Sequence, residues 1–159
     1  MPHAVRKLTV ALSIALGIAA PAGVLIAAAS ARDLQKARHE HYHDLGDAFK
    51  TVRDQTRAGS PDMAKIKTAA KIINEASIEQ GRSFPAGTGP ESGKTRALPE
   101  IWQRPEDFKA AQKVFSDAAP KLLAAANASD LDAVKSTYGD LGKACKNCHD
   151  TFRSPEEHD

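Results

Sequence analysis

Apolar residues recur at intervals of three and four along four stretches of the chain, which is the spacing of one face of an α-helix. The clearest stretch lies near the C-terminus. Ser129 is expected to cap this helix, with Asp132 three residues later in a near capping-box arrangement. Its inward positions are Leu131, Val134, Tyr138, Leu141, Cys145, Cys148 and Phe152. Both cysteines of the chain therefore belong to the inward face of the last helix.

Three further helices are predicted upstream. The first runs from about Asp33 to Arg57 and carries an inward stripe of Arg38, Tyr42, Leu45, Phe49 and Val52. The second begins with Ser60 as its cap and Pro61 at its first helical position. It ends near Gln80, and its inward face holds Ile66, Ala69, Ala70, Ile73 and Ala76.

The third helix is expected from about Pro105 to Asn127, with a kink at Pro120. Its inward stripe is Phe108, Ala111, Phe115, Ala118 and Leu122. Residues 81–104, rich in proline and glycine, form a long connection before it, and loops of this length are usually functional or disordered. Trp102, the only tryptophan, is expected to anchor that connection or to pack on a cofactor. Since strand signals are sparse, these elements predict an all-α domain.

The N-terminus has the features of an export signal. His3, Arg6 and Lys7 precede an apolar run over residues 8–29, and Ala29, Ser30 and Ala31 offer a small-residue cleavage site. We expect residues 1–31 to be a signal peptide and residues 32–159 to be one exported, periplasmic domain. A retained membrane anchor is the alternative, because the apolar run is about 20 residues long.

Charge excludes two classes of partner. The full chain carries a formal net charge of +2. Loss of Arg6 and Lys7 with the leader brings the net charge of the remaining domain to zero. No basic patch then remains to bind nucleic acid or an anionic membrane. We expect neither partner for the cleaved protein.

The motif Cys145-Lys-Asn-Cys148-His149 is the main chemical feature of the sequence. A Cys-x-x-Cys-His pentad is typical of covalent c-type haem attachment. Each thiol can form a thioether to a haem vinyl group, and the imidazole can ligate the iron. A zinc ribbon would need a second cysteine pair, and a thioredoxin-like dithiol would need a βαβ pattern. The expected cofactor is one haem c, held by Cys145 and Cys148, with His149 as its axial ligand.

The position of this motif at the end of a helical chain resembles the cytochrome c′ family. The resemblance includes Leu98-Pro-Glu-Ile-Trp102, the run from Gly139 to Gly142 and the segment from Cys145 to Arg153. It implies an antiparallel up-down four-helix bundle with the haem near the C-terminal helix. It also implies that the first-helix Arg38 lies near a haem propionate and that Arg153 lies beside His149. Trp102 and Phe152 are expected to pack on the haem.

The resemblance also identifies the distal side of the haem. The residue four positions after the first-helix arginine faces the sixth coordination position, and here that residue is Tyr42, with Leu45 beside it. In the low-spin branch of the family a methionine at this position ligates the iron. The remaining methionine outside the leader, Met63, lies at the other end of the first helical hairpin. Five-coordinate high-spin iron is therefore implied, with a low-spin electron-transfer cytochrome as the alternative.

The histidines beside Tyr42 leave a further alternative open. Helix geometry places His39 about 60° from Tyr42, and His41 and His43 about 100° away on opposite flanks. Solvated flank positions are expected for all three. Ligation of iron, or of another metal by the i, i+4 pair His39 and His43, stays open.

The resemblance implies a binder of nitric oxide and carbon monoxide. An apolar distal pocket without a placed hydrogen-bond donor favours these gases over dioxygen. Either the Tyr42 hydroxyl donates a hydrogen bond to the bound gas, or the Tyr42 ring blocks access to the iron. Electron transfer with a redox protein partner is the rival. No enzymatic activity is expected, although His39 and Arg38 leave weak peroxidase activity open. The resemblance further implies a homodimer.

Overall fold

The structure is a computed structural model that describes the backbone of residues 22–155 and the side chains of residues 31–155. Most of the expected leader, residues 1–31, lies outside these limits, so the leader and its cleavage stay a prediction. Within the described range there are four long helices, one short helix and two 3-10 turns. They are α1 (Ala22–Arg57), α2 (Met63–Glu79), η1 (Gln80–Arg82), η2 (Pro90–Ser92), α3 (Glu100–Gln103), α4 (Pro105–Asn127) and α5 (Leu131–Phe152).

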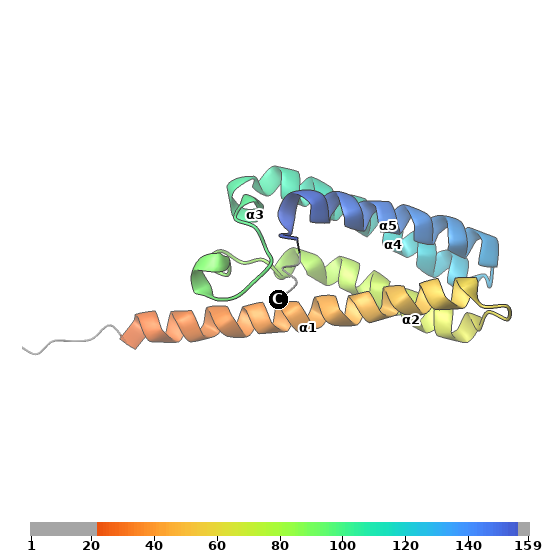
Figure 1. Cartoon of the computed structure of the whole chain (residues 1–159), viewed down its shortest axis with the longest axis horizontal. Coiled ribbons are helices and arrows are strands. Elements are labelled where there is room, and N and C mark those ends of the chain that lie inside the picture. The colour runs from red at the N-terminus through yellow and green to blue at the C-terminus, as the bar shows by residue number, and fades with distance from the viewer. Residues whose placement is uncertain (1–21, 156–159) are drawn as a thin grey trace, which may run out of the picture.

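The four long helices form an antiparallel bundle of two hairpins. Helices α1 and α2 make one layer, and α4 and α5 make the other, with α3 and the 3-10 turns gathered at one end (Figure 1). Each hairpin is closed by a short turn, which requires its two helices to run in opposite directions. The predicted all-α four-helix bundle is confirmed.

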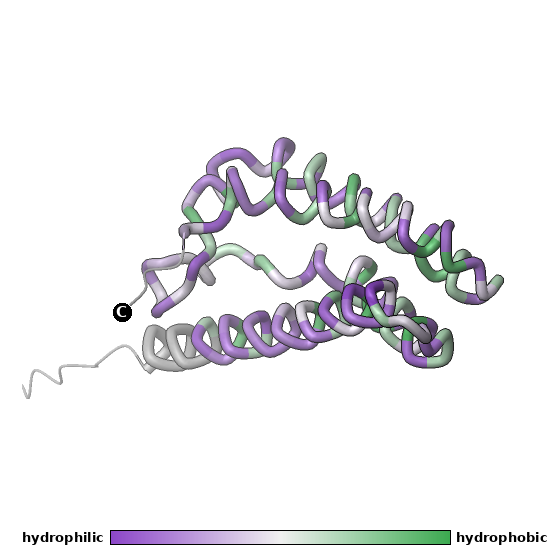
Figure 2. The backbone as a smooth tube through the Cα atoms, turned by 45° about the vertical axis from the view of Figure 1, so that its right-hand side comes forward, coloured by the Kyte–Doolittle hydropathy of each residue, from purple (hydrophilic) through white to green (hydrophobic). Residues whose placement is uncertain are grey.

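The core is built from the predicted inward stripes. Hydrophobic and polar positions are interspersed along the helices (Figure 2). The main core cluster contains buried residues of all four long helices: Leu45, Ala48, Val52, Ile66, Ala69, Ala70, Ile73, Ala76, Phe115, Ala119, Leu122, Ala125, Ala126, Val134, Leu141 and Ala144. Because small alanines intersperse with larger side chains, the helices approach closely.

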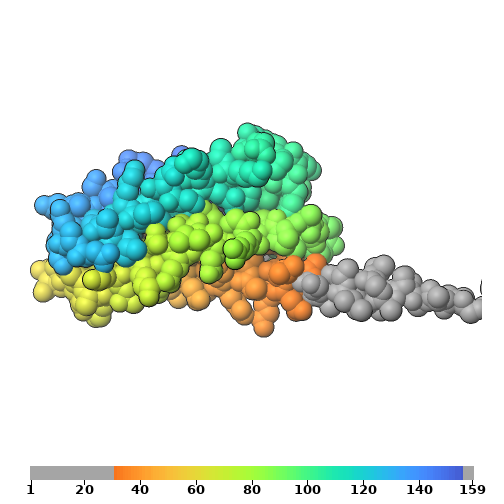
Figure 3. Space-filling model, turned by 180° about the vertical axis from the view of Figure 1, so that it is seen from behind, coloured from red at the N-terminus to blue at the C-terminus, as the bar shows by residue number. Residues whose placement is uncertain are grey.

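Polar side chains join the two hairpins where α2 meets α4. These two helices lie side by side on the face shown in Figure 3. The Gln80 amide nitrogen donates to the Gln112 carbonyl at 2.9 Å and to the Ser116 hydroxyl at 2.8 Å. In return, the Gln112 amide donates to the Gln80 carbonyl at 3.1 Å. Gln80 is buried, so these bonds satisfy polar groups that would otherwise be costly to desolvate.

Three predicted helix starts are wrong. α1 begins at Ala22 and not at Asp33, because the alanine-rich segment that follows Pro21 favours helix. Asp62 caps α2 in place of Ser60, since its carboxylate accepts hydrogen bonds from the backbone of residues 64 and 65. Asp130 caps α5 in place of Ser129.

The backbone conformation explains why Asp130, and not Ser129, caps α5. Ser129 has a φ of 54°, in the left-handed region, and therefore cannot take the extended conformation of a helix cap. Asp130 has that conformation and accepts a hydrogen bond from the Ala133 N–H at 2.9 Å. The bounds predicted for α4 are confirmed, and its helix continues through Pro120.

Among the helices within the described range, none has an apolar stretch of sufficient length to span a bilayer.

The assignment of the α2 cap can be tested by substitution. Asp62→Ala should lower the free energy of unfolding by about 1 kcal/mol, because two N–H groups at the start of α2 lose their acceptor. Ser60→Ala is the matched control, and it should change the stability by less than about 0.5 kcal/mol. Urea unfolding followed by circular dichroism measures both. A larger loss for Ser60→Ala than for Asp62→Ala would contradict the assignment.

Candidate haem site

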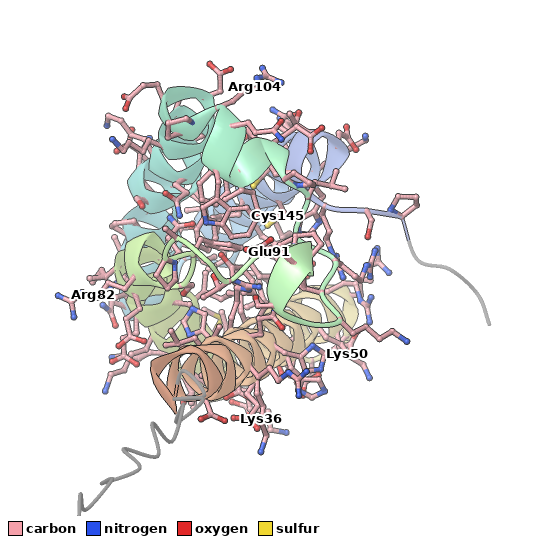
Figure 4. The ribbon with its side chains drawn as sticks, turned by 90° about the vertical axis from the view of Figure 1, so that its left-hand side faces the viewer. Lys36, Lys50, Arg82, Glu91, Arg104 and Cys145 are labelled. Atoms are coloured by element: carbon pink, nitrogen blue, oxygen red, sulfur yellow. The ribbon has the colours of Figure 1, made fainter. Side chains whose placement is uncertain are left out.

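The two cysteines of α5 lie where the two hydrophobic clusters of the protein meet. Cys145 packs against the main core cluster, and Cys148 packs against a smaller cluster formed by Ile101, Phe108 and Phe152. Both thiols are free and partly buried. Figure 4 shows Cys145 between the helical layers, whereas Lys36, Lys50, Arg82 and Arg104 point outward. A flat apolar group attached to both sulfurs would therefore contact both clusters.

Burial keeps both cysteines in the thiol form. It raises the pKa of Cys145 to about 11, with a further contribution from the neighbouring Cys148, and it also raises the pKa of Cys148. Thiolates are the form in which cysteine binds metals directly. No cluster of three or more metal-ligating side chains occurs among the residues that the structure describes. Among the described residues, the pair therefore has too few neighbouring ligands to form a zinc site.

His149 follows the cysteine pair at the edge of the same face of α5. Although much of its surface is exposed, burial by its surroundings lowers its pKa, and the guanidinium groups of Arg153 and Arg96 lower it further. Asp150 acts in the opposite direction. A neutral imidazole is the form that ligates iron, so the environment of His149 favours its predicted role.

An aromatic cluster lies beside Cys148. Its centre is Phe84, from the connection after α2, whose ring lies 4.9 Å from the Phe108 ring, 5.9 Å from the Tyr42 ring and 6.4 Å from the Trp102 ring, centroid to centroid. The Phe108 ring in turn lies 5.1 Å from that of Phe152. Residues from α1, α3, α4, α5 and the connection therefore meet at one end of the bundle.

Tyr42 is the residue of α1 that is most closely coupled to the cysteines. Burial raises its pKa well above the ordinary value, and the two thiols contribute to this, whereas Arg38 opposes it. The phenol is thus held neutral. Within residues 31–155, where side chains are described, the Tyr42 hydroxyl makes no hydrogen bond. Leu45, one turn further along α1, is buried in the main core cluster.

The neighbouring histidines differ from one another. His39 and His43 are exposed, as predicted, and His43 lies near the carboxylate of Asp47 at 3.6 Å. The prediction of a solvated flank is wrong for His41. Its side chain is 21% exposed, lies 3.8 Å from the Glu79 carboxylate of α2, and has a buried Nε2 atom without a hydrogen-bond partner. His41 packs on α2 because the α1–α2 interface is wider than the apolar stripe indicates.

Arg38 is buried at 6% exposure, and among the described residues all of its hydrogen-bond acceptors are neutral. One terminal nitrogen donates to the Ser83 carbonyl at 3.2 Å and to the Thr88 hydroxyl at 3.0 Å. The other donates to the Thr88 carbonyl at 2.9 Å and to the Thr95 hydroxyl at 3.1 Å. The guanidinium also lies 4.8 Å from the centre of the Phe84 ring. Its positive charge is therefore available to an anionic group in the site.

Two residues that sequence analysis missed complete this arrangement. Gln35, one turn before Arg38, is buried and donates from its amide to the carbonyls of Thr88 and Gly89 at 3.2 and 2.7 Å. Thr88 is 1% exposed and donates from its hydroxyl to the Pro85 carbonyl at 2.8 Å. A side chain at Gly93 would collide with the Gln35 amide oxygen. Because Gln35 lies among other polar residues of α1, the sequence pattern did not indicate that it is buried.

The remaining predicted site residues lie at the same end of the bundle. The Trp102 indole N–H donates to the carbonyls of Phe84 and Pro85 at 3.2 and 3.1 Å, which bears out its role as an anchor of the connection. Phe152 is buried at 4% exposure in the smaller cluster. Arg153 follows it as the C-terminal cap of α5, and its backbone N–H donates to the His149 carbonyl. Their packing against haem stays a prediction.

The sequence profile of the family described as cytochrome C′ matches residues 33–153. The chain belongs to the cytochrome c′ family.

This cytochrome c′ is similar to known members of the family in both sequence and structure. It is 31% identical over 157 residues to a cytochrome c′ from Allochromatium vinosum, an alignment that covers 97% of this chain and 99% of the relative. A solved structure described as the nitric oxide complex of a mutant cytochrome c prime from Alcaligenes xylosoxidans has a TM-score of 0.72 and 32% identity. It covers 79% of this chain and 97% of its own.

A further solved structure, described as a cytochrome c′ with an unusual ligand-controlled dimer dissociation, has a TM-score of 0.73 and 27% identity. It covers 79% of this chain and 97% of its own.

The residues present fit the cofactor of the family, a covalently attached haem c. Two free thiols lie on one helix face between two apolar clusters, and an imidazole held in its neutral form follows them. The buried guanidinium of Arg38 on α1 has no carboxylate partner among the described residues, and a haem propionate would neutralise it. Aromatic rings supply the apolar contact surface that a porphyrin requires.

Removal of the Thr88 hydroxyl should loosen the connection that closes this site. Thr88→Val leaves the Arg38 guanidinium and the Pro85 carbonyl each one hydrogen bond short, so we expect a loss of about 1–3 kcal/mol in the free energy of unfolding. Thr68→Val removes an exposed hydroxyl on α2 and serves as the control, with a loss below about 0.5 kcal/mol. Equal losses in urea titrations would show that Thr88 has no special role.

Ionisation of Tyr42 should make the protein less stable in alkali. The folded-state pKa of Tyr42 is raised above its unfolded value of about 10, so the stability it contributes is present below about pH 10 and is lost as the pH rises above it. The stability of Tyr42→Phe should therefore fall less steeply than that of the wild type between pH 10 and 12. Tyr138→Phe, at a less buried tyrosine, should show a smaller difference. Parallel stability curves for wild type and Tyr42→Phe would contradict the expected burial.

Proposed function

We propose that this cytochrome c′ is an exported haem c protein that binds nitric oxide and carbon monoxide at a five-coordinate, high-spin iron. Cys145 and Cys148 attach the haem, and His149 is the axial ligand. The haem iron supplies the atom that binds the gas. Residues 1–31 act as the signal peptide that directs the chain to the periplasm, where the domain of residues 32–159 functions.

The observation that carries this proposal is the identity and state of Tyr42. It is the α1 side chain coupled electrostatically to both cysteine sulfurs, and it lies on the inward face opposite α5. It offers no thioether or imidazole, and its raised pKa disfavours the phenolate that could ligate iron. The position across from His149 thus lacks a strong protein ligand and stays open to a small molecule.

The surroundings of Tyr42 also favour neutral gases. Its ring packs against Phe84, which makes this side of the site apolar and restricts the room above the iron. The neighbouring Leu45 is buried and cannot donate a hydrogen bond. Nitric oxide and carbon monoxide need less stabilisation by a donor than bound dioxygen does. The Tyr42 hydroxyl is the donor nearest to the bound gas, and its removal tests how much it contributes.

The other side chains hold the haem in place. Arg38 pairs with a propionate through its buried guanidinium, and Trp102 and Phe152 pack on the porphyrin. Arg153 lies beside His149 and adds positive charge there. Because these contacts come from separate elements, the haem is held by the bundle as well as by its thioethers.

Further properties of the protein follow from the same proposal. The protein acts as a binder, buffer or carrier of gas and not as an enzyme, since the histidines next to Arg38 are exposed or directed toward α2. It can also shuttle electrons to a redox protein partner. It forms a homodimer, a proposal supported by one structural relative that is described as having a ligand-controlled dimer dissociation.

Absorption spectra of the purified holoprotein provide the decisive test. The ferrous protein should show a broad Soret band without sharp α and β bands, and nitric oxide should change this spectrum. Sharp low-spin bands that do not respond to nitric oxide would instead indicate a sixth protein ligand and an electron-transfer cytochrome.

Substitution of Tyr42 by methionine should convert the high-spin, gas-binding protein into a low-spin cytochrome. Tyr42→Met places a thioether at this position, so we expect low-spin bands and at least tenfold slower binding of carbon monoxide, because the gas must displace the sulfur. Tyr42→Phe, which keeps the ring and removes the hydroxyl, is the matched control and should stay high-spin. If Tyr42→Met keeps the wild-type spectrum and binding rate, Tyr42 does not face the iron.

A further inference from the structure

The only tryptophan of the chain lies between two surface cavities at the site end of the bundle. Figure 4 looks onto this end and labels Glu91, which belongs to η2. The first cavity has a volume of about 270 Å³ and is lined by Ala86, Gly87, Glu91, Pro99, Trp102 and Gln103. Trp102 also lines the second cavity, of about 210 Å³, beside α4. Its ring is therefore accessible on two sides.

Trp102 presents carbon surface to the first cavity. Its indole N–H already donates to the carbonyls of Phe84 and Pro85, so the polar edge of the ring is occupied and its orientation is fixed. The π surface of an indole attracts a cation, and tryptophan does so more strongly than the other aromatic residues. One wall of the cavity is thus suited to a positively charged group with an apolar stem.

Glu91 adds a negative charge to the same cavity. It is exposed and forms no ion pair among the described residues. One carboxylate oxygen accepts a hydrogen bond from the Gly89 backbone N–H at 3.0 Å, which orients the group without neutralising it. Lys94, three residues later, is exposed and does not pair with it. The charge of the carboxylate is therefore available to a cation that enters from solvent.

The composition of the cavity selects among cations. Calcium and magnesium ions need about six oxygen ligands or more, and this cavity is lined by a single carboxylate. An alkylammonium group instead uses one carboxylate together with aromatic surface. Arginine favours a two-point contact with both oxygens of a carboxylate, but one oxygen of Glu91 is already engaged by Gly89. Lysine, a point charge on a long apolar stem, fits this arrangement best.

We propose that the cavity between η2 and α3 binds a lysine side chain of a redox protein partner. The Glu91 carboxylate faces the ammonium group, and the Trp102 ring covers the stem. This inference rests on the proposed function, in which the protein can pass electrons to such a partner. Trp102 packs on the smaller hydrophobic cluster, as Cys148 does, and its ring lies 6.4 Å from that of Phe84. A lysine bound here brings the partner to the end of the bundle where the haem is attached.

The second cavity supports a protein as the source of the lysine, in preference to a free amine. Its wall includes Phe84, Ile101 and Phe108 beside Trp102. Protein interfaces are enriched in aromatic residues of this kind, surrounded by a polar rim. A partner that covers Trp102 can thus place a lysine on one side of the indole and an apolar side chain on the other.

Nuclear magnetic resonance of the isotopically labelled holoprotein tests the cavity directly. Because the chain has one tryptophan, its indole N–H gives a single cross-peak. The probe is Nα-acetyl-lysine amide, titrated into the diamagnetic ferrous carbon monoxide form. Nα-acetyl-norleucine amide, which lacks only the ammonium group, is the matched probe, with sodium chloride added to equal ionic strength. The lysine probe should shift the cross-peak saturably, and the norleucine probe should bind at least about threefold more weakly.

Substitution of Glu91 tests the role of its charge. Glu91→Gln keeps an oxygen that can accept from the Gly89 N–H, so the turn should be preserved. It should raise the dissociation constant of the lysine probe about two- to fivefold. Glu75→Gln is the matched control, because Glu75 is exposed on α2, pairs with Lys71 and does not line the cavity. It should change the constant by less than about 1.5-fold.

Electron transfer provides a second readout. The ferrous haem gives one electron to hexaammineruthenium(III), a cation, or to ferricyanide, an anion, and stopped-flow absorption measures both rates. Glu91→Gln should lower the ratio of the cationic to the anionic rate about two- to fivefold, whereas Glu75→Gln should leave it within about 1.5-fold of the wild type. An unchanged ratio in Glu91→Gln would show that the cavity is not used in electron transfer.

The outcomes of the titrations separate the two proposals. Equal binding of the two probes, no shift of the indole cross-peak, or equal effects of Glu91→Gln and Glu75→Gln would each show that this inference is wrong. The proposed function is judged independently by the spin state of the iron and by nitric oxide binding. If it fails because a sixth protein ligand makes the iron low-spin, the ferrous protein is still diamagnetic, so the titrations still decide the lysine site.

Discussion

The hydrogen bonds from Arg38 and Gln35 to the connection between α2 and α4 organise the end of the bundle that holds the site. These two side chains lie one turn apart on α1 and reach five residues of the connection, with Thr88 at the centre. The connection carries Phe84, and it leads into the segment that ends at Trp102. These bonds therefore help to hold Phe84, the centre of the aromatic cluster, in place.

The same bonds explain how a positive charge can be buried in a small helical protein. A buried guanidinium is costly unless its donors find acceptors, and here carbonyls and hydroxyls accept hydrogen bonds from both terminal nitrogens without cancelling the charge. The cluster around Phe84 adds a favourable contact with the face of the ring. The Arg38 charge thus lies in an apolar environment, where its attraction for a propionate is stronger than it would be in water. This combination is better suited to an anionic cofactor than a surface arginine would be.

The sequence predicted the helical faces well because they depend on local periodicity. Every residue of the four expected stripes is buried or partly buried, and Tyr42 was placed on the inward face from helix geometry alone. The caps at Asp62 and Asp130 were missed by one or two residues, since neighbouring serines and aspartates offer similar oxygen atoms and the backbone angles decide between them. The roles of Gln35 and Thr88 could not be predicted. Their hydrogen-bond partners across the site are about 50 residues away, and no spacing rule reports such contacts.

The backbone of residues 96–98 forms hydrogen bonds with that of residues 152–154, and this pairing has a consequence for the order in which the molecule assembles. At the far end of the bundle, short turns join α1 to α2 and α4 to α5, and these hairpins need little loop closure. The site end instead depends on contacts between segments 45 to 58 residues apart, which form slowly. Folding should therefore proceed from the turns toward the site, and the cysteines should be among the last residues to become buried. A fold that closes last around its own attachment point leaves that point accessible while a cofactor is being joined to it.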